Sequence, residues 1–157
     1  MKKIIAYSLA LLLSCIRLNA QKNIDLIISI DEKIVSSISG LNFIAVTLNG
    51  EERIQADYYP GHLSLSDSDY NKLLDTVTRT VYISFDYTEQ QNTKQHLYHY
   101  QIDLKKGWLK HYYYILSIYN MTKRKYRDMF STAMPYVYEF EYPGGATKLV
   151  RKKSKAR

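Results

Sequence analysis

Alternation of apolar and polar residues is the feature that most limits how this chain can fold. Ile24, Leu26, Ile28 and Ile30 occupy every second position, and the same alternation recurs in segments 44–48, 54–58, 81–87, 98–104 and 136–142. Because successive side chains of a strand point to opposite faces, a period of two is typical of half-buried β-strands. The pattern predicts about seven or eight strands joined mostly by short turns.

The turns between these segments favour antiparallel pairing. Asn49-Gly50 separates two alternating segments, which predicts a tight hairpin with positive φ at both turn residues. Pro143-Gly144-Gly145 predicts a second hairpin, returning through Leu149 and Val150. Residues 112–119 are apolar on both faces, which is typical of a central strand that is covered on both sides. We therefore expect a mainly β fold, an antiparallel β-sandwich or an open barrel, with one or two short helices.

Two segments depart from the strand pattern. Ser66 precedes Asp67 and Asp69 and fits the N-cap of a short helix. That helix would present apolar residues at helical spacing, namely Tyr70, Leu73, Leu74 and Val77. Residues 120–135 are compatible with a helix capped by Thr122 or with an irregular crossover, and the sequence leaves both open.

The first twenty residues have the composition of an export signal. Lys2 and Lys3 precede an apolar run over residues 4–16, which is too short for an ordinary membrane span and typical of a secretory signal peptide. A buried N-terminal helix is the alternative, against which the positive start argues. We expect residues 1–20 to be the signal, residues 21–147 one Tyr-rich β domain, and residues 148–157 a basic tail.

Two processing sites compete within this signal. Cleavage after Ala20 would leave a soluble form that starts at Gln21, and the Asn-Ala-Gln junction resembles secretory signals common among Bacteroidota. Alternatively, Leu12-Leu13-Ser14-Cys15 resembles a bacterial lipobox, in which Cys15 would be lipidated. Because Cys15 is the single cysteine, both alternatives exclude disulfides and thiol catalysis.

Positive charge is concentrated outside the body of the chain. The net charge is +7, but three bases precede position 21 and six lie in residues 148–157, so residues 21–147 hold 13 bases against 15 acids. This distribution argues against nucleic acid as a partner. The remaining basic candidates, for contact with an anionic membrane surface or a polyanionic glycan, are Lys123, Arg124, Lys125, Arg127, Arg151, Lys152, Lys153, Lys155 and Arg157. The alternative for the tail is a solvated, frayed end.

Residues with catalytic or metal-binding chemistry do not form a specific motif. His96 and His99 are three positions apart, so in a strand they point to opposite faces. Glu139 and Glu141 share a strand face, and paired carboxylates are what a glycoside hydrolase uses. Alternating acids on the solvent side of any exposed strand have the same arrangement. We expect no cofactor, no metal site and no enzymatic activity.

Tyrosine is the unusual component, with 15 of the 137 residues after position 20. Its ring packs in a core while its hydroxyl reaches a polar partner, so tyrosines serve both as core and as binding surface. Consecutive tyrosines point to opposite faces, which makes Tyr58, Tyr59, Tyr112, Tyr113 and Tyr114 candidate contact residues.

These observations favour an exported protein, periplasmic or secreted, that acts as a non-enzymatic binding or structural module through contact with another envelope protein. One alternative is an accessory outer-membrane lipoprotein of a multi-protein envelope assembly, which lipidation of Cys15 would decide. Another is a small secreted hydrolase or glycan-binding module.

Overall fold

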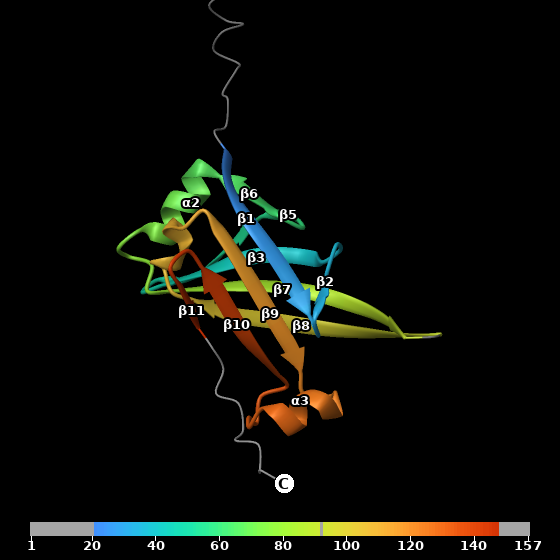
Figure 1. The fold of residues 1–157 in the computed structure, drawn as a ribbon. Helices are drawn as coiled ribbons and strands as arrows, with labels where there is room; N and C mark the ends of the chain where they lie inside the picture. Colours follow the sequence, from blue (N-terminus) through green and yellow to red (C-terminus); the bar gives the residue numbers. More distant parts are fainter. Residues whose placement is uncertain (1–20, 92, 148–157) are drawn as a thin grey trace, which may run out of the picture.

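The computed structural model describes residues 21–91 and 93–147 and places their strands in two sheets (Figure 1). The larger sheet has the order β11-β10-β9-β1-β6-β5, and β2 pairs with β1. Its members are β1 (Gln21–Ile30), β2 (Lys33–Ile34), β5 (Asp57–Tyr59), β6 (His62–Ser66), β9 (Tyr113–Asn120), β10 (Tyr136–Tyr142) and β11 (Gly145–Thr147). The mainly β, sandwich-like fold is confirmed, and the strands that the sequence pattern did not indicate are the short β2, β5 and β6.

The smaller sheet has the order β4-β3-β7-β8. It consists of β3 (Ser39–Thr47), β4 (Gly50–Gln55), β7 (Thr80–Gln91) and β8 (Lys94–Leu104). Its strands run across those of the larger sheet, and β7 and β8 extend past their neighbours at one end (Figure 1). β4 and β8 are therefore the edge strands of this sheet.

One pairing differs from the antiparallel expectation. β1 lies parallel to β9, from Asp25 opposite Tyr113 to Ile30 opposite Ile118. A parallel pair requires a long connection, and here the connection is the chain from β2 to β8. The first strand is thus held inside the larger sheet by a strand that comes almost ninety residues later, as the hydrogen bond between the Ser29 and Ser117 hydroxyls also shows.

The core lies between the two sheets and follows the predicted alternation. Ile24, Leu26, Ile28 and Ile30 are all buried, as are Val81, Ile83, Phe85, Tyr100, Ile102 and Leu104 of the smaller sheet. On β3 the predicted inward face is wrong: Phe43 and Ala45 enter the core cluster, whereas Leu48 is 73% exposed. Ile44 is buried between Arg53 and Tyr82 of the neighbouring strands.

The tight turns are partly where the sequence predicts them. β3 and β4 form the predicted hairpin, but its turn residues are Leu48 and Asn49, and only Gly50 has a positive φ, of 133°. Two consecutive positive φ angles occur instead at Asp31 (53°) and Glu32 (69°), between β1 and β2. The last hairpin turns as predicted, with a φ of 81° at Gly144.

Both helical segments are present. α2 (Asp67–Leu74) begins at the predicted N-cap, where the Ser66 hydroxyl accepts the Asp69 N–H at 3.1 Å, and Leu73 is fully buried. The helix ends before Val77, which is 61% exposed and therefore lies outside the predicted apolar face.

α3 (Arg124–Met129) resolves the ambiguity of residues 120–135 in favour of a helix. Its N-cap is Lys123, without a side-chain cap, so the predicted capping by Thr122 is wrong. Tyr126 and Phe130 pack with Val137 in a second, smaller cluster. The outer side of β9 is only half-buried, because α3 reaches only the end of that strand, where Tyr119 meets Tyr126 and Phe130.

Several predictions fall outside the described residues. They concern the export signal over residues 1–20 with Cys15, the continuation of the last hairpin through Leu149 and Val150, and the basic tail with Arg151, Lys152, Lys153, Lys155 and Arg157. Within the described part of the chain, no helix combines the length and apolar character needed to cross a bilayer.

Candidate functional site

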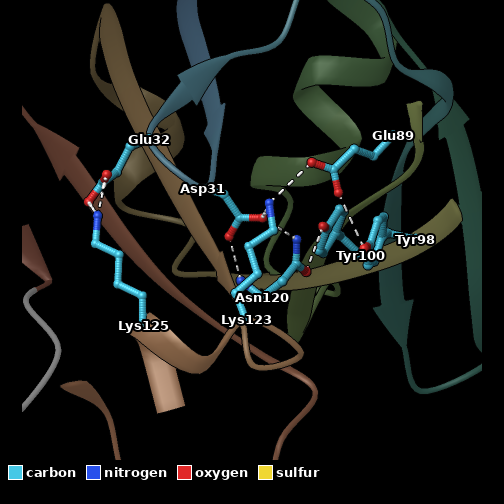
Figure 2. A network of polar contacts seen from close by, with 8 residues as sticks. All are labelled: Asp31, Glu32, Glu89, Tyr98, Tyr100, Asn120, Lys123 and Lys125. Carbon is cyan, nitrogen blue, oxygen red and sulfur yellow. Dashed lines mark hydrogen bonds and ion pairs between the residues drawn. The ribbon is translucent and has the colours of Figure 1, made fainter. Parts of the chain in front are cut away.

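A buried polar network lies where the end of β1 meets the end of β9 (Figure 2). The Asp31 carboxylate accepts hydrogen bonds from the backbone N–H and the side-chain Nδ2 of Asn120, both at 2.8 Å. It also pairs with Lys123 Nζ at 2.7 Å. Asn120 Oδ1 in turn accepts the Tyr100 hydroxyl at 2.9 Å. The network satisfies a buried carboxylate and joins β1, β9 and β8.

Lys123 connects this network to β7. Its Nζ lies 3.1 Å from Glu89 Oε1, and the second oxygen of Glu89 accepts the Tyr98 hydroxyl at 3.4 Å. Burial alone would lower the pKa of Lys123, but hydrogen bonds to the carboxylates of Asp31 and Glu89 outweigh this effect and raise the pKa above its ordinary value. The ammonium therefore stays charged, and its charge is offset within the protein.

Two other cations of the predicted basic cluster also have acidic neighbours. Lys125 Nζ lies 2.6 Å from Glu32, an exposed pair that is drawn in Figure 2. Arg124 faces Asp128 at 3.8 Å across one turn of α3, and Arg127 has interactions of its own. Lys123 points into the buried network rather than outward, which is a correction to its predicted role as a surface contact for polyanions.

Two of the candidate contact tyrosines belong to the interior. Tyr114 is only 3% exposed, and its hydroxyl donates to the backbone carbonyls of Trp108 and His111. Tyr58 is half-buried, and its hydroxyl accepts the N–H of Ile28 at 3.1 Å and donates to the carbonyl of Val35 at 3.3 Å. These two tyrosines therefore join segments of the chain through hydrogen bonds of their hydroxyl groups, which corrects their prediction as contact surface.

The other three candidate tyrosines do lie at the surface. Tyr59 is exposed at the edge strand β5 and stacks on His62, with 4.5 Å between the ring centroids. Tyr112 and Tyr113 are exposed at the start of β9 and contact each other edge to face. They form two separate small aromatic surfaces, because no ring contact joins Tyr59 to Tyr112 or Tyr113 within residues 21–91 and 93–147.

Two further tyrosines, whose role the sequence did not indicate, lie against the edge strand β8. The Tyr136 hydroxyl accepts the backbone N–H of Gln101 at 2.9 Å and donates to the carbonyl of the same residue at 2.7 Å. Tyr138, two residues further along β10, places its hydroxyl beside the backbone of Asp103. Side chains of the larger sheet thus bind backbone groups of the smaller sheet that face away from β7.

The remainder of this edge is open. Backbone groups two residues apart in a strand point to the same side, so the N–H and C=O groups of Gln95, Leu97 and His99 face away from β7, as those of Gln101 do. None of these groups has a partner within the described chain. Leu97 is 70% exposed. We call residues 94–99 the open edge of β8.

An aromatic groove lies beside the capped part of β8. It has a volume of about 530 Å³, and its lining includes Tyr82, Trp108, Tyr136 and Tyr138, together with Gln101 and Asp103. The Trp108 ring stacks on Phe140 at a centroid distance of 4.9 Å, and Lys105 Nζ lies 5.6 Å from its centroid. We use the name aromatic groove for these lining residues.

The histidines and acids with catalytic chemistry are dispersed. His99 pairs with Asp86 at 2.7 Å on the exposed face of the smaller sheet, and His96 is exposed nearby. Glu139 accepts the Tyr119 hydroxyl at 3.2 Å, while Glu141 is exposed. Among the described residues, no group of three His, Cys, Asp or Glu side chains could hold a metal ion.

Comparisons with family models, with curated proteins and with solved structures gave no match to this chain. The candidate sites therefore rest on geometry alone.

Proposed function

We propose that this chain is an exported, non-enzymatic binding module of the bacterial cell envelope that acts through contact with another protein. The observation that supports the proposal is the divided edge of β8. Tyr136 caps its inner part at Gln101, with Tyr138 beside Asp103, whereas the backbone groups of the open edge, beside the exposed Leu97, have no partner among the described residues.

An unpaired strand edge is a template for another strand. Added strands bind through main-chain hydrogen bonds, and the side chains on either face provide specificity. The open edge also lies on the part of β7 and β8 that runs past the rest of the smaller sheet, since β3 pairs with β7 only as far as Asp86 (Figure 1). No described residue bonds to the outward backbone groups of the open edge, which leaves them for an extended segment of a partner.

The charge of the open edge favours a partner other than a second copy. Residues 94–99 include Lys94, His96 and His99 and no acid. His99 already pairs with Asp86, which leaves Lys94 as the formal charge of this edge. A second copy would bring no acidic side chain to Lys94 through its own residues 94–99, whereas a strand with acidic side chains would complement it. The partner we propose is therefore an extended, acidic segment of another envelope protein.

The test is site-specific photo-crosslinking in cells of the source bacterium. A photoreactive residue at Gln95 should yield a discrete adduct with one other protein, and the same residue at Gln55 on the opposite edge strand β4 should not. Leu97→Pro should abolish the adduct, because proline removes the outward N–H without breaking the β7–β8 ladder. Leu97→Thr retains the N–H and should keep the adduct.

Three results would contradict the proposal: no adduct at Gln95, an adduct with the mass of two copies of this chain, or an adduct that persists in Leu97→Pro.

Export is tested separately, by the intact mass of the protein in membrane and periplasmic fractions. A species that begins at Gln21 supports a periplasmic or secreted module. An acylated Cys15 supports the variant in which the chain is an accessory outer-membrane lipoprotein. An unprocessed cytoplasmic chain would contradict both.

A further inference from the structure

We propose that the aromatic groove is a binding site for a neutral saccharide, separate from the open edge of β8. The groove combines aromatic rings with planar polar side chains. Tyr82 and Trp108 lie in its lining together with the amide of Gln101 and the carboxylate of Asp103. Concave sites with a largely apolar lining and a few polar groups are typical of small-molecule sites.

The polar groups of the groove are available to a ligand. The side chains of Gln101 and Asp103 are exposed, and neither makes a hydrogen bond or ion pair within the described chain. The carboxylate offers only acceptors, whereas the amide offers both donors and an acceptor. Two such side chains lie about 7 Å apart on the same strand, a spacing that suits hydroxyl groups at opposite ends of a sugar ring or on neighbouring rings of an oligosaccharide.

The backbone around the groove argues against a peptide as its ligand. Peptides that bind to a strand edge need free N–H and C=O groups. Here both backbone groups of Gln101 are already bonded to Tyr136, and the Tyr138 hydroxyl lies beside the backbone of Asp103. A ligand of this groove must be recognised by side chains. The apolar faces of a sugar ring against aromatic rings, and its hydroxyls against Gln101 and Asp103, meet that requirement.

The charges at the groove favour a neutral saccharide. Lys105 and Asp103 both line it, and their formal charges cancel. An anionic glycan would meet the Asp103 carboxylate, and burying that pair of like charges would cost binding energy. We therefore expect neutral hexose or N-acetylhexosamine oligomers to bind in preference to uronic acid polymers.

The chain carries its own reporter for this test, because Trp108 is the single tryptophan and lies in the groove. The purified protein would be titrated with cellohexaose, maltohexaose, xylohexaose and chitohexaose while its tryptophan emission is recorded. Isothermal titration calorimetry would give the affinity independently. We expect saturable binding of at least one of the four oligosaccharides.

Groove variants and a matched surface variant decide whether binding is local. Gln101→Ala and Asp103→Asn should each weaken binding at least tenfold, while Gln55→Ala on β4, also an exposed glutamine in the smaller sheet, should leave it unchanged. Circular dichroism of each variant confirms that it is folded.

The absence of saturable binding to all four probes would overturn the proposal, and so would binding that neither groove variant weakens. Leu97→Pro should retain saccharide binding in full, so failure at the groove and failure at the open edge can be told apart.

Discussion

Asp31 and Glu32 offer a paired test of what the polar network contributes to stability. They are consecutive residues, both have positive φ, and each forms an ion pair with a lysine at or near α3, at 2.7 Å for Asp31 and 2.6 Å for Glu32. They differ in burial: the side chain of Asp31 is 4% exposed and that of Glu32 is 55% exposed. The isosteric changes Asp31→Asn and Glu32→Gln remove one charge each and leave the length of the side chain unchanged.

The magnitudes follow from that difference in burial. Removing one partner of a buried ion pair costs about 3–5 kcal/mol. Lys123 is about 30% exposed and keeps Glu89 as a partner, so we expect the low end, about 3 kcal/mol. The amide N–H₂ group that Asp31→Asn introduces would also face the donors of Asn120 or Lys123. An exposed pair such as Glu32–Lys125 contributes only about 0–1 kcal/mol, so Glu32→Gln should cost less than about 1 kcal/mol.

The assay is equilibrium unfolding in urea, followed by Trp108 fluorescence and by far-ultraviolet circular dichroism. The free energy of unfolding is extrapolated to water for the wild type and for both variants. Asparagine tolerates the left-handed region better than most residues, so backbone strain does not account for a loss in Asp31→Asn. Equal losses in the two variants, or a loss below about 1 kcal/mol in Asp31→Asn, would refute the reasoning that burial decides the contribution.

Three further predictions concern the hydrogen bonds of the Tyr136 hydroxyl, the N-cap of α2 and the pH dependence of stability. Tyr136→Phe should lower the free energy of unfolding by about 1 kcal/mol and speed hydrogen exchange of the Gln101 amide; unchanged exchange would count against edge capping. Ser66→Ala should cost about 1 kcal/mol in urea unfolding, and a neutral result would contradict the capping role of Ser66. Burial raises the pKa of Tyr100 and Tyr114, so the native state holds these protons more tightly than the unfolded chain. Stability should then be complete below about pH 10 and fall above it, as tyrosinate absorbance and circular dichroism would show; constant stability up to about pH 12 would contradict this.

The sequence predicted the architecture well wherever one face of a strand is apolar and the other is polar. On β1 the alternation has one register, and all four isoleucine and leucine positions are buried. On β3 the run from Phe43 to Val46 is apolar at every position, so both faces of the strand carry apolar side chains. Periodicity alone therefore could not decide that Phe43 rather than Ile44 faces the opposite sheet.

The turn at Asp31 and Glu32 was not predictable from local sequence. Two positive φ angles are typical of Asn-Gly, Asp-Gly and Gly-Gly pairs; Asp31 fits the first position, but Glu32 stands where glycine is expected. At this turn the chain contacts residues that are distant in the sequence, since Asp31 binds Asn120, which comes 89 positions later. A contact between residues so far apart in the sequence cannot be inferred from the spacing of residues along a strand.

The abundance of tyrosine was visible in the sequence, but its distribution between core and surface was not. Tyr112, Tyr113 and Tyr114 are consecutive, so in a strand Tyr113 points to one face and its two neighbours point to the other. Only the parallel pairing with β1 determines that Tyr114 points inward. Likewise, Tyr136 and Tyr138 share a face by simple alternation. That their hydroxyls reach β8 depends on how the two sheets cross.

Hydrogen bonds from tyrosine hydroxyls to the backbone explain why so many of these aromatic positions are tyrosine rather than phenylalanine. Tyr58, Tyr114 and Tyr136 each pack a ring at the border of the core and bind backbone groups that no strand pairs. A phenylalanine at these positions would fill the same space and leave buried or edge backbone groups unsatisfied. Where such a hydrogen bond exists, as at Gln101, the strand edge cannot recruit another strand and only its side chains remain for recognition. Where no described residue makes such a bond, as from Lys94 to His99, the backbone itself is available. The placement of two tyrosines on β10 thereby divides one edge strand into a side-chain site, for which we propose a saccharide, and a backbone site, for which we propose a protein strand.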